Sequence, residues 1–253
     1  MFDLSALKNY DFIMTLGFYN PSLLPKCDVC FYPFLDCEAD FYVRYEVGTE
    51  EGVVALLLYE FADKSADLRL KDFIKSLDYG YLSAESNVSE EELSEIKNQI
   101  KLRKKPLLLI GDDISHHAQK SNILNMLCAL KTHSNLEVIC AESLPSEFIL
   151  KPIANLPEHN GCVIFVAQDS NESNAYSKQV SIDLNANPTL KISREFARAW
   201  RLGDLQEIRF MLDSQEICAT CKIDENFSGI IGILSGARQK SIYPFQTIAI
   251  KRA

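Results

Sequence analysis

Apolar residues in this chain gather in short runs that are separated by polar segments. Residues 107–110 are four consecutive apolar residues, a run typical of a strand buried on both faces of a parallel sheet. Aromatic and β-branched residues, which suit a pleated and half-buried surface, are frequent in the other runs. The patterns predict strands over residues 10–16, 27–34, 41–46, 107–110, 136–140 and 162–167.

Two segments between these runs carry the start signals of helices. Residues 49–62 begin with acids and continue as a long apolar body, which is the charge order that a helix dipole favours. Ser89 and Glu92 have the spacing of a capping box. The polar helix that they start is predicted to run to Lys105, because Pro106 stops it.

A further helix is predicted around Ile123, Leu127 and Leu130, which recur at i, i+4 and i+7. Buried strands and helices therefore alternate in this part of the chain, as in proteins with a parallel sheet. We predict an α/β fold, with a Rossmann-like parallel-sheet domain over residues 1–168.

The last third of the chain begins with a polar stretch. Residues 169–190 are rich in asparagine and serine and predict a linker between two domains. Ile192, Phe196 and Trp200 then recur every four residues, which predicts an amphipathic helix that ends at Gly203.

Beyond this helix, apolar and polar residues alternate as they do in half-buried strands. The pattern predicts strands over residues 208–212, 217–223, 229–234 and 246–250. The first two form a predicted hairpin with its turn at residues 213–216. We therefore predict a helix and a small β-rich, barrel-like domain over residues 191–253.

The charge balance limits the partners that the chain can have. Its 253 residues include 26 basic and 35 acidic side chains, which gives a net charge of −9. Such a surface repels phosphate backbones, so we exclude nucleic acid as a partner. Basic residues cluster at positions 101–105, where they are predicted to face the negative end of a helix dipole.

The sequence also bears on where the chain is found. The longest unbroken apolar run, residues 53–59, is far shorter than the roughly twenty residues that a membrane helix needs. Residues 1–18 lack the basic start and apolar centre of a secretion signal. We therefore expect a cytoplasmic protein without direct membrane insertion.

The eight cysteines have no regular spacing and are expected to remain reduced thiols. Cys27, Cys30 and Cys37 form the candidate for a metal ion or an iron–sulfur cluster, provided that they lie on a loop. On a strand, Cys27 and Cys30 would point to opposite faces, and no fourth ligand is close in sequence. Cys218 and Cys221 have the same geometry on a predicted strand, so we assign no metal ligand to either pair.

Gly111, Asp112 and Asp113 follow a predicted strand, where a Rossmann-like domain would place a phosphate loop. Such a loop needs several glycines, whereas this turn has one glycine and two acids that repel a pyrophosphate. His116 and His117 are adjacent on the expected helix and do not form an i, i+4 metal chelate. The sequence therefore predicts no catalytic residue, no cofactor-binding residue and no cofactor.

The order of four segments resembles a known family. The segments are LKNYDFIMTLG (7–17), RYEVGTEEGVVALL (44–57), KKPLLLIGDDISHH (104–117) and RLGDLQEIRFMLDSQEICATCKIDENFSGIIGILSG (201–236). They resemble the later portion of the molybdopterin-dependent oxidoreductases, most closely the large iron–sulfur subunit of bacterial respiratory complex I, the NADH-quinone oxidoreductase. Each motif alone is common, and it is their shared order and spacing over most of the chain that carries the resemblance.

The resemblance implies a function. In that family the later α/β domain helps to hold a pterin and a terminal β-barrel closes over it, and the complex I subunit keeps these domains without the molybdenum centre. The chain is thus expected to be a non-catalytic component, similar to that large subunit, of an NADH or flavodoxin to quinone oxidoreductase. It would have a structural or docking role on the cytoplasmic side, peripheral to the inner membrane. Its implied partners are the other subunits of a membrane-bound respiratory complex and a flavodoxin-like donor.

Three alternatives stay open. The chain could be a fragment of a molybdopterin-binding oxidoreductase, which bound molybdenum would reveal. It could be a small metal or cluster carrier that uses Cys27, Cys30 and Cys37. It could also be an unrelated α/β protein with a β-rich tail.

Overall fold

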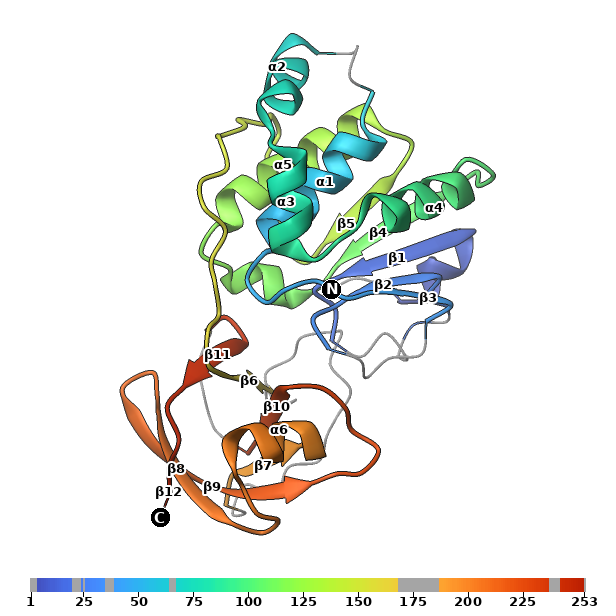
Figure 1. The fold of residues 1–253 in the computed structure, drawn as a ribbon. Helices are drawn as coiled ribbons and strands as arrows, with labels where there is room; N and C mark the ends of the chain where they lie inside the picture. Colours follow the sequence, from blue (N-terminus) through green and yellow to red (C-terminus); the bar gives the residue numbers. More distant parts are fainter. Residues whose placement is uncertain are drawn as a thin grey trace. The chain divides into compact units, whose positions relative to one another are not determined.

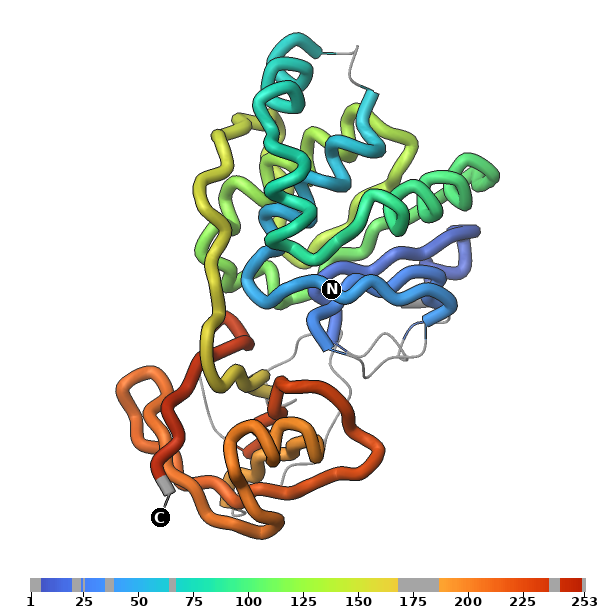
Figure 2. The backbone as a smooth tube through the Cα atoms, viewed as in Figure 1, coloured from blue at the N-terminus to red at the C-terminus, as the bar shows by residue number. Residues whose placement is uncertain are grey.

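The structure, a computed structural model, describes residues 4–19, 24, 26–34, 39–63, 67–167, 187–236 and 242–252. The fold is mixed α/β and divides into two compact units (Figures 1 and 2). Unit 1 comprises Met1–Pro33 and Cys37–Glu158, and unit 2 comprises Phe34–Asp36 and His159–Ala253.

Unit 1 is built on a five-stranded parallel sheet with the strand order β3-β2-β1-β4-β5. Its strands are β1 (Phe12–Leu16), β2 (Val29–Phe31), β3 (Phe41–Val43), β4 (Pro106–Ile110) and β5 (Glu137–Cys140). Every residue of β1 and β4 is buried, as expected for central strands that are covered on both faces. The predicted Rossmann-like parallel sheet is thus confirmed.

The α-helices of unit 1 gather on one face of this sheet (Figure 1). The helical segments are η1 (Leu4–Asn9), α1 (Glu50–Phe61), α2 (Leu68–Ser76), α3 (Tyr79–Ser86), α4 (Glu90–Ile100), η3 (Asp112–His116) and α5 (Lys120–His133). α1 packs against α3, α4 and α5, and its residues from Glu50 to Leu58 are all buried, which explains its long apolar body. Within the described part of the chain, no helix has the length and apolar character needed to span a membrane.

Two helices, α2 and α3, lie where the sequence pattern predicted none. Both begin at an aspartate whose carboxylate accepts backbone N–H groups of the first turn, Asp67 for α2 and Asp78 for α3. Leu70, Phe73 and Ile74 form the narrow buried side of α2. These helices have two or three turns each, so their apolar periodicity is too short to be recognised.

α4 starts as predicted and ends earlier than predicted. The Ser89 hydroxyl accepts the N–H of Glu92, and the Glu92 carboxylate accepts the N–H of Ser89 at 2.9 Å, so the capping box is confirmed. The helix ends at Ile100 and not at Lys105.

Asp11 accounts for this early end. Its carboxylate accepts the backbone N–H groups of Lys104 at 2.8 Å and Lys105 at 2.9 Å, which holds both residues out of the helix. Pro106 adds to this effect, because the residue before a proline avoids the helical conformation. The basic residues 101–105 therefore form a loop between α4 and β4 instead of the last helical turn.

The predicted helix around Ile123 is α5, but it begins later than expected. The turn that follows β4 continues as the 3₁₀ segment η3, and α5 starts at Lys120. His116 ends η3, and His117 lies between the two segments. The sequence suggested that the two histidines lie at the start of one helix, and this prediction was wrong.

Unit 2 contains a seven-stranded mixed sheet that curls into a half-barrel, with the order β11-β6-β10-β7-β9-β8-β12 (Figure 1). Its elements are β6 (Cys162–Val166), β7 (Thr189–Ile192), α6 (Arg194–Trp200), β8 (Glu207–Leu212), β9 (Gln215–Ile223), β10 (Ile231–Ser235), β11 (Phe245–Ile248) and β12 (Lys251–Arg252). The predicted β-rich C-terminal part is thus confirmed.

The predicted hairpin is formed by β8 and β9, and its turn is tighter than expected. Asp213 and Ser214 alone connect the strands, with φ angles of 43° and 65°. Positive φ at both central residues is the mark of a type I′ turn, whose twist matches that of the strands. Cys218 is exposed and Cys221 is buried, so these two cysteines lie on opposite faces of β9 as predicted.

The helix predicted around Phe196 is α6. Ser193 caps it by accepting the N–H of Phe196 at 3.0 Å. Ile192, which the prediction placed on this helix, is the last residue of β7 instead. The four-residue spacing from Ile192 to Phe196 extends across the capping residue Ser193, so it did not show where β7 ends and α6 begins.

The boundary between the units lies before the predicted one. Residues 162–167 were predicted to belong to the α/β domain, but β6 pairs with β10 in parallel and with β11 antiparallel, so it belongs to unit 2. The chain passes from unit 1 to unit 2 between Glu158 and His159. A buried apolar run has the same pattern in either sheet, so the sequence could not assign it.

The predicted linker, residues 169–190, falls largely outside the described residues. Its last two residues, Thr189 and Leu190, are part of β7. Leu190 is fully buried and pairs with Leu234 of β10 and Cys221 of β9. This end of the predicted linker is therefore core structure.

Candidate functional site

The candidate site is the carboxyl edge of the parallel sheet in unit 1. β1 and β4 are neighbours in the middle of the sheet. From β1 the chain continues outward to β2 on one side, and from β4 it continues outward to β5 on the opposite side. In open α/β sheets, ligands bind outside the carboxyl ends of the strands at such a switch in direction. Gly17 follows β1 here, and Gly111, Asp112 and Asp113 follow β4.

Two glycines bring the ends of β1 and β4 into close contact. Gly111 donates its N–H to the carbonyl oxygen of Leu16 at 2.9 Å. A Cβ atom on Gly111 would lie 1.9 Å from the carbonyl oxygen of Gly17, which has a φ of 62°. The two glycines thus serve the packing of one strand end on the other.

Asp113 is buried next to the end of β2. Tyr32, the first residue after β2, donates its hydroxyl to the Asp113 carboxylate at 2.7 Å. Burial raises the pKa of Asp113 well above its ordinary value, and the hydrogen bond from Tyr32 offsets this only in part. The same burial, with the charge of Asp113, raises the pKa of Tyr32.

Glu50, the first residue of α1, is fully buried beside His117. The Tyr45 hydroxyl donates to Glu50 Oε1 at 3.2 Å, and His117 Nε2 lies 3.2 Å from Glu50 Oε2 and 3.0 Å from the carbonyl oxygen of Gly48. The N–H of Gln119 donates to His117 Nδ1 at 3.0 Å. The heavy-atom geometry therefore assigns the proton of the neutral ring to Nε2.

The pKa of His117 responds to two opposing influences. Burial lowers it, whereas the hydrogen bond and the charge of Glu50 raise it, and the net result is a pKa above the ordinary value. A second proton would sit on Nδ1 and would break the bond from Gln119. The Glu50 charge and the Gln119 bond thus favour different protonation states of one buried ring.

Glu51, the next residue of α1, is joined to a segment that follows β5. Asn122 Nδ2 donates to Glu51 Oε1 at 2.7 Å and to the carbonyl oxygen of Lys151 at 3.2 Å. The N–H of Lys151 donates back to Asn122 Oδ1 at 3.1 Å. The Asn122 amide therefore links α5, α1 and the chain near residue 151.

A less buried group of polar residues continues along this edge toward β5. Burial raises the pKa of Asp112, with His116 lowering it and Glu142 raising it. Burial likewise raises the pKa of Cys140 to about 11, so the thiol remains protonated and is not an activated nucleophile. Lys120 forms an ion pair with Glu142 at 3.1 Å.

The edge as a whole is therefore an acidic, internally bonded structure. Its carboxylates have partners within unit 1, and its two glycines are used in strand packing. A bound phosphate is stabilised by free N–H groups and positive charge, and buried carboxylates oppose it. This geometry stabilises the packing of the strand ends against each other.

Two of the candidate cysteines, Cys27 and Cys30, lie before and within β2. Cys27 precedes β2, and its thiol donates to the carbonyl oxygen of Val29 at 3.4 Å and lies 3.7 Å from the Thr15 hydroxyl. Cys30 is buried within β2 and pairs with Thr15 in register. Cys37 lies outside the described residues, among which no group of three or more histidine, cysteine or acidic side chains could hold a metal ion.

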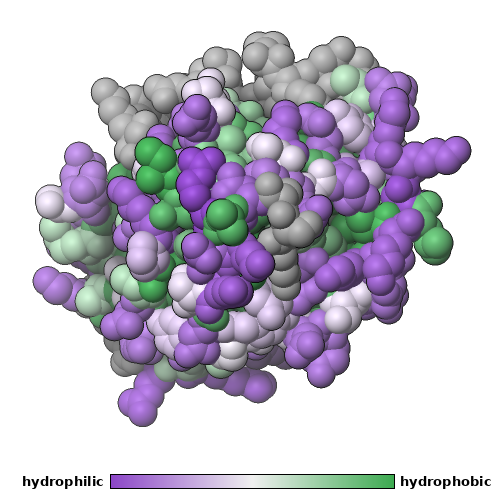
Figure 3. Space-filling model, turned by 90° about the horizontal axis from the view of Figure 1, so that it is seen from above, coloured by the Kyte–Doolittle hydropathy of each residue, from purple (hydrophilic) through white to green (hydrophobic). Residues whose placement is uncertain are grey.

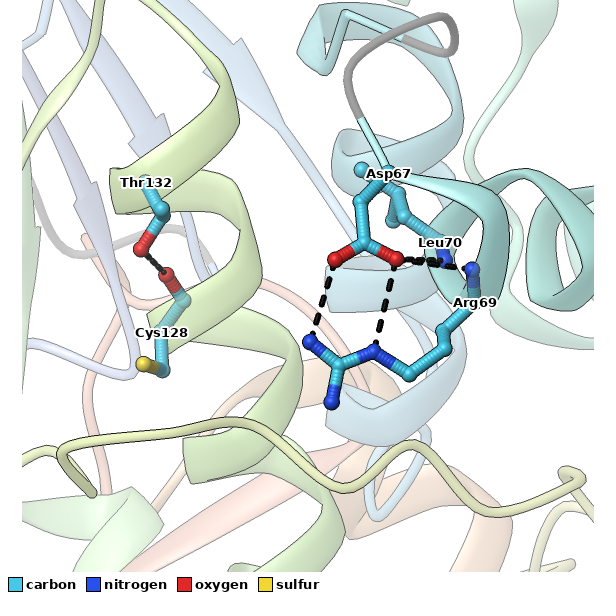
Figure 4. Close-up of polar contacts among 5 residues, drawn as sticks. All are labelled: Asp67, Arg69, Leu70, Cys128 and Thr132. Atoms are coloured by element: carbon cyan, nitrogen blue, oxygen red, sulfur yellow. Dashed lines mark hydrogen bonds and ion pairs between the residues drawn. The ribbon is translucent and has the colours of Figure 1, made fainter.

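A separate groove of about 380 Å³ lies between α2 and the segment near residue 150. Phe73, Phe148 and Pro152 line it with apolar surface, and Arg69 lies over the Phe148 ring at 5.0 Å. Asp67 accepts hydrogen bonds from the Arg69 guanidinium as well as from the first turn of α2, as Figure 4 shows. The charge of Arg69 is therefore already balanced and does not call for an anionic ligand.

The sequence pointed to Asp113 and His117 but not to Tyr32, Glu50 or Asn122. A usable signal was present: Glu50 and Glu51 open a helix whose body is apolar on all sides, and acids in such a place need buried partners. Most of those partners are far away along the chain. Asn122, for example, lies 71 positions from Glu51, and no local sequence pattern predicts such a contact.

Comparison of the chain with protein-family models and with characterised proteins gives no match. The function is therefore proposed from two sources, the order of the four sequence segments described above and the geometry of the chain's own residues.

Proposed function

We propose that this chain is a non-catalytic component of a complex I-like respiratory enzyme, similar to the large iron–sulfur subunit of that complex. In this role it holds neighbouring subunits in place or offers them a docking surface on the cytoplasmic side of the inner membrane. Its partners are the other subunits of the complex, and the electron donor of the whole enzyme is NADH or a flavodoxin-like protein.

The carboxyl edge of the parallel sheet is the observation that carries this proposal. In the α/β architecture this edge is where a nucleotide or pterin would be expected to bind. Here the carboxyl groups of Asp113, Glu50 and Glu51 occupy the edge and are bonded to Tyr32, Tyr45 and Asn122. A chain that keeps the sheet and fills its ligand-binding edge with its own side chains is suited to a scaffold role.

The packing of the strand ends supports the same role. The backbone of Gly17 lies in the space in front of Gly111, where a phosphate loop would leave room for a ligand. Burial also raises the pKa of Cys140 at this edge, which keeps the thiol protonated and a poor nucleophile. These features favour structural support over chemistry at this edge.

The experiment that tests the proposal is isolation of the tagged full chain from membranes of the cell that makes it. The membranes are solubilised in mild detergent, and membranes with the untagged chain serve as the control. The associated chains are identified and quantified by mass spectrometry, and molybdenum, iron and zinc are counted. We expect recovery of the other complex I-like subunits in fixed proportion to the chain.

Three results would contradict the proposal, each in a different way. Recovery of the chain alone, with an assembled and active respiratory complex in cells that lack it, would exclude the subunit role. Stoichiometric molybdenum on the chain would favour the pterin-binding alternative. Iron or zinc that is lost when Cys27 and Cys30 are replaced by serine would favour the metal or cluster carrier.

A further inference from the structure

The loop between α4 and β4, residues 101–105, is the most concentrated positive surface that the sequence of this acidic chain contains. Lys101, Arg103, Lys104 and Lys105 are all exposed in it. Between them lies Leu102, of which 86% is exposed. Four cations around one exposed leucine differ from the ordinary solvated surface of a protein whose net charge is −9.

The backbone of this loop is fixed. The N–H groups of residues 101–103 donate to carbonyl oxygens of the last turn of α4, at 2.9 to 3.3 Å. The Asp11 carboxylate accepts the N–H groups of Lys104 and Lys105, and these bonds lower the pKa of Asp11. Every N–H of the loop is thus occupied, so the loop has no backbone donor to offer, and its side chains can bind a partner with little loss of backbone entropy.

The cations of the loop form no close ion pair with a carboxylate of the described chain, although the charge of Arg103 helps to lower the pKa of Asp11. Elsewhere in unit 1, cations such as Lys97, Lys120 and Lys131 are paired with carboxylates. None of the four loop cations lies within ion-pair distance of a described carboxylate. Both oxygens of Asp11, the carboxylate that lies at the loop, accept backbone N–H groups.

Two of the loop cations have uncharged neighbours. Lys101 Nζ donates to Asn98 Oδ1 at 3.2 Å, and the Arg103 guanidinium lies 5.4 Å from the centre of the Phe12 ring. These contacts orient the two side chains but leave their positive charge unneutralised. The loop therefore presents a net positive charge to a partner, since Asp11 places one negative charge beside its four cations.

The loop lies at the amino edge of the parallel sheet, because it leads into β4 and Asp11 leads into β1. In Figure 1 it is the green turn at the right-hand end of the sheet, and Figure 3 shows many hydrophilic side chains on that side of the molecule. Lys26 lies at the same edge, since its Nζ is 3.4 Å from the carbonyl oxygen of Asp11, but it is already paired with Asp28. The positive edge is thus opposite to the acidic carboxyl edge.

We propose that residues 101–105 form a docking surface for an acidic surface of a neighbouring protein, which receives Leu102 in an apolar pocket between its carboxylates. An apolar anchor surrounded by a polar rim is the usual arrangement of a protein–protein contact. Charge complementarity identifies the partner chemistry, because none of the four cations forms a close ion pair with a carboxylate in the described part of this chain. The inference rests on the docking role proposed above and names the surface that performs it.

A bilayer of acidic lipids and a nucleic acid are also anionic, but both fit this loop less well than an acidic protein surface does. Glu95 lies on α4 about 9 Å along the helix from Lys101, at 1.5 Å per residue. Together with Glu90 and Glu91 it repels a bilayer of acidic lipids or a nucleic acid that extends beyond the loop. A compact acidic patch of a folded protein can contact the loop without meeting these acids.

The test is zero-length cross-linking with a carbodiimide, which joins lysine amines to carboxylates in contact. The full-length chain is treated in freshly broken cells, and cross-linked peptides are identified by mass spectrometry. We expect links from Lys101, Lys104 or Lys105 to aspartate or glutamate residues of one other protein. The exposed Lys71 and Lys75 on α2 serve as the internal control and should give no link to that protein.

Charge reversal is the second part of the test. The triple variant Lys101→Glu, Arg103→Glu and Lys104→Glu should reduce recovery of the linked protein by about tenfold or more, because like charges then face each other. The control variant Lys71→Glu with Lys75→Glu should recover it as the unaltered chain does. Leu102→Ser should also weaken recovery, whereas Leu68→Ser, at a 76% exposed site, should not. Equal circular dichroism and melting temperatures show that the variants fold.

The outcomes separate this inference from the proposed function. Links to a respiratory subunit support both, and links to a protein outside the respiratory complex support the surface and contradict the subunit role. Links confined to this chain, or equal recovery by the loop and control variants, overturn the surface even if the chain isolates with the complex. Binding to phosphatidylglycerol vesicles or to duplex DNA, lost in the triple variant while the cross-links to protein are absent, also overturns it.

Discussion

Gly111 is the residue on which the closure of the carboxyl edge depends. No side chain fits there, because a Cβ atom would lie 1.9 Å from the carbonyl oxygen of Gly17 and 2.6 Å from the Cα of Phe18. These are backbone atoms, which cannot move aside as a flexible side chain can. In the sequence, Gly111 is the one glycine of a turn that is too poor in glycine for a phosphate loop. The structure shows why a glycine is needed at this position.

We therefore predict that Gly111→Ala lowers the free energy of unfolding by about 3 kcal/mol, the upper end of the usual cost of overpacking. Gly80→Ala is the matched control, since its nearest neighbour would be Asp78 Oδ1 at 3.7 Å and alanine favours the helix α3. The control should stabilise the protein slightly or leave it unchanged. Urea unfolding followed by circular dichroism measures both, and equal effects of the two substitutions would contradict the account of the strand ends.

Asp113 gives a prediction on pH dependence. Its pKa in the folded chain lies well above the ordinary value of 3.8, so over the interval between the two values the folded state holds a proton that the unfolded state has released. Stability therefore falls as the pH rises through this interval, by up to about 1.4 kcal/mol per pH unit. Asp113→Asn keeps an acceptor for Tyr32 but does not titrate. The free energy of unfolding of this variant, relative to that of the unaltered chain, should therefore increase with pH across the interval.

The control for this prediction is Tyr32→Phe, which removes the hydrogen bond that lowers the pKa of Asp113. Without this bond the decline in stability should extend to higher pH. Unfolding by urea at a series of pH values measures the three proteins together. Parallel curves for Asp113→Asn and the unaltered chain would show that Asp113 is not the group responsible.

At the scale of elements, the sequence predicted what local physical chemistry determines. The apolar run at residues 107–110, the capping box of Ser89 and the face alternation of Cys218 and Cys221 are all found. Each depends on residues within a few positions of one another. These features belong to single strands, helices or turns.

The elements that the sequence misplaced depend on distant residues. The end of α4 is set by Asp11, more than ninety positions away, whose carboxylate takes the N–H groups of Lys104 and Lys105. β6 belongs to unit 2 because it pairs with β10 and β11, which occur much later in the chain. The bonded network of Tyr32 and Asp113 is of the same kind, at a separation of 81 residues. Local periodicity carries no information about such pairings.

The β8–β9 hairpin offers a prediction at this scale. Ser214 has a φ of 65°, and a residue with a Cβ atom pays about 1 kcal/mol for the left-handed conformation that glycine adopts freely. Ser214→Gly should therefore stabilise the hairpin by about that amount. Ser214→Val, with a branched side chain, should destabilise it. Amide hydrogen exchange in β8 and β9 measures the change, and no slowing in Ser214→Gly would argue against a type I′ turn.

At the scale of the whole molecule, the two units have separate hydrophobic cores. Leu57 of α1 belongs to the core of unit 1, and Phe210 of β8 belongs to that of unit 2. Both side chains are almost completely buried. A core residue stabilises the elements that pack around it, and domains with their own cores open as separate cooperative units.

Substitution of one core residue in each unit tests this separation. Phe210→Ala should cost unit 2 about 3 kcal/mol or more, the usual loss for a buried phenylalanine, and so accelerate amide exchange in β8 and β9 by roughly a hundredfold. Exchange in β1 and β4 should remain unchanged. Leu57→Ala should give the reverse pattern, with loss of protection in β1 and β4 alone. Faster exchange in both units from either substitution would mean that the chain unfolds as a single body, and the boundary at Glu158 would then mark no independent unit.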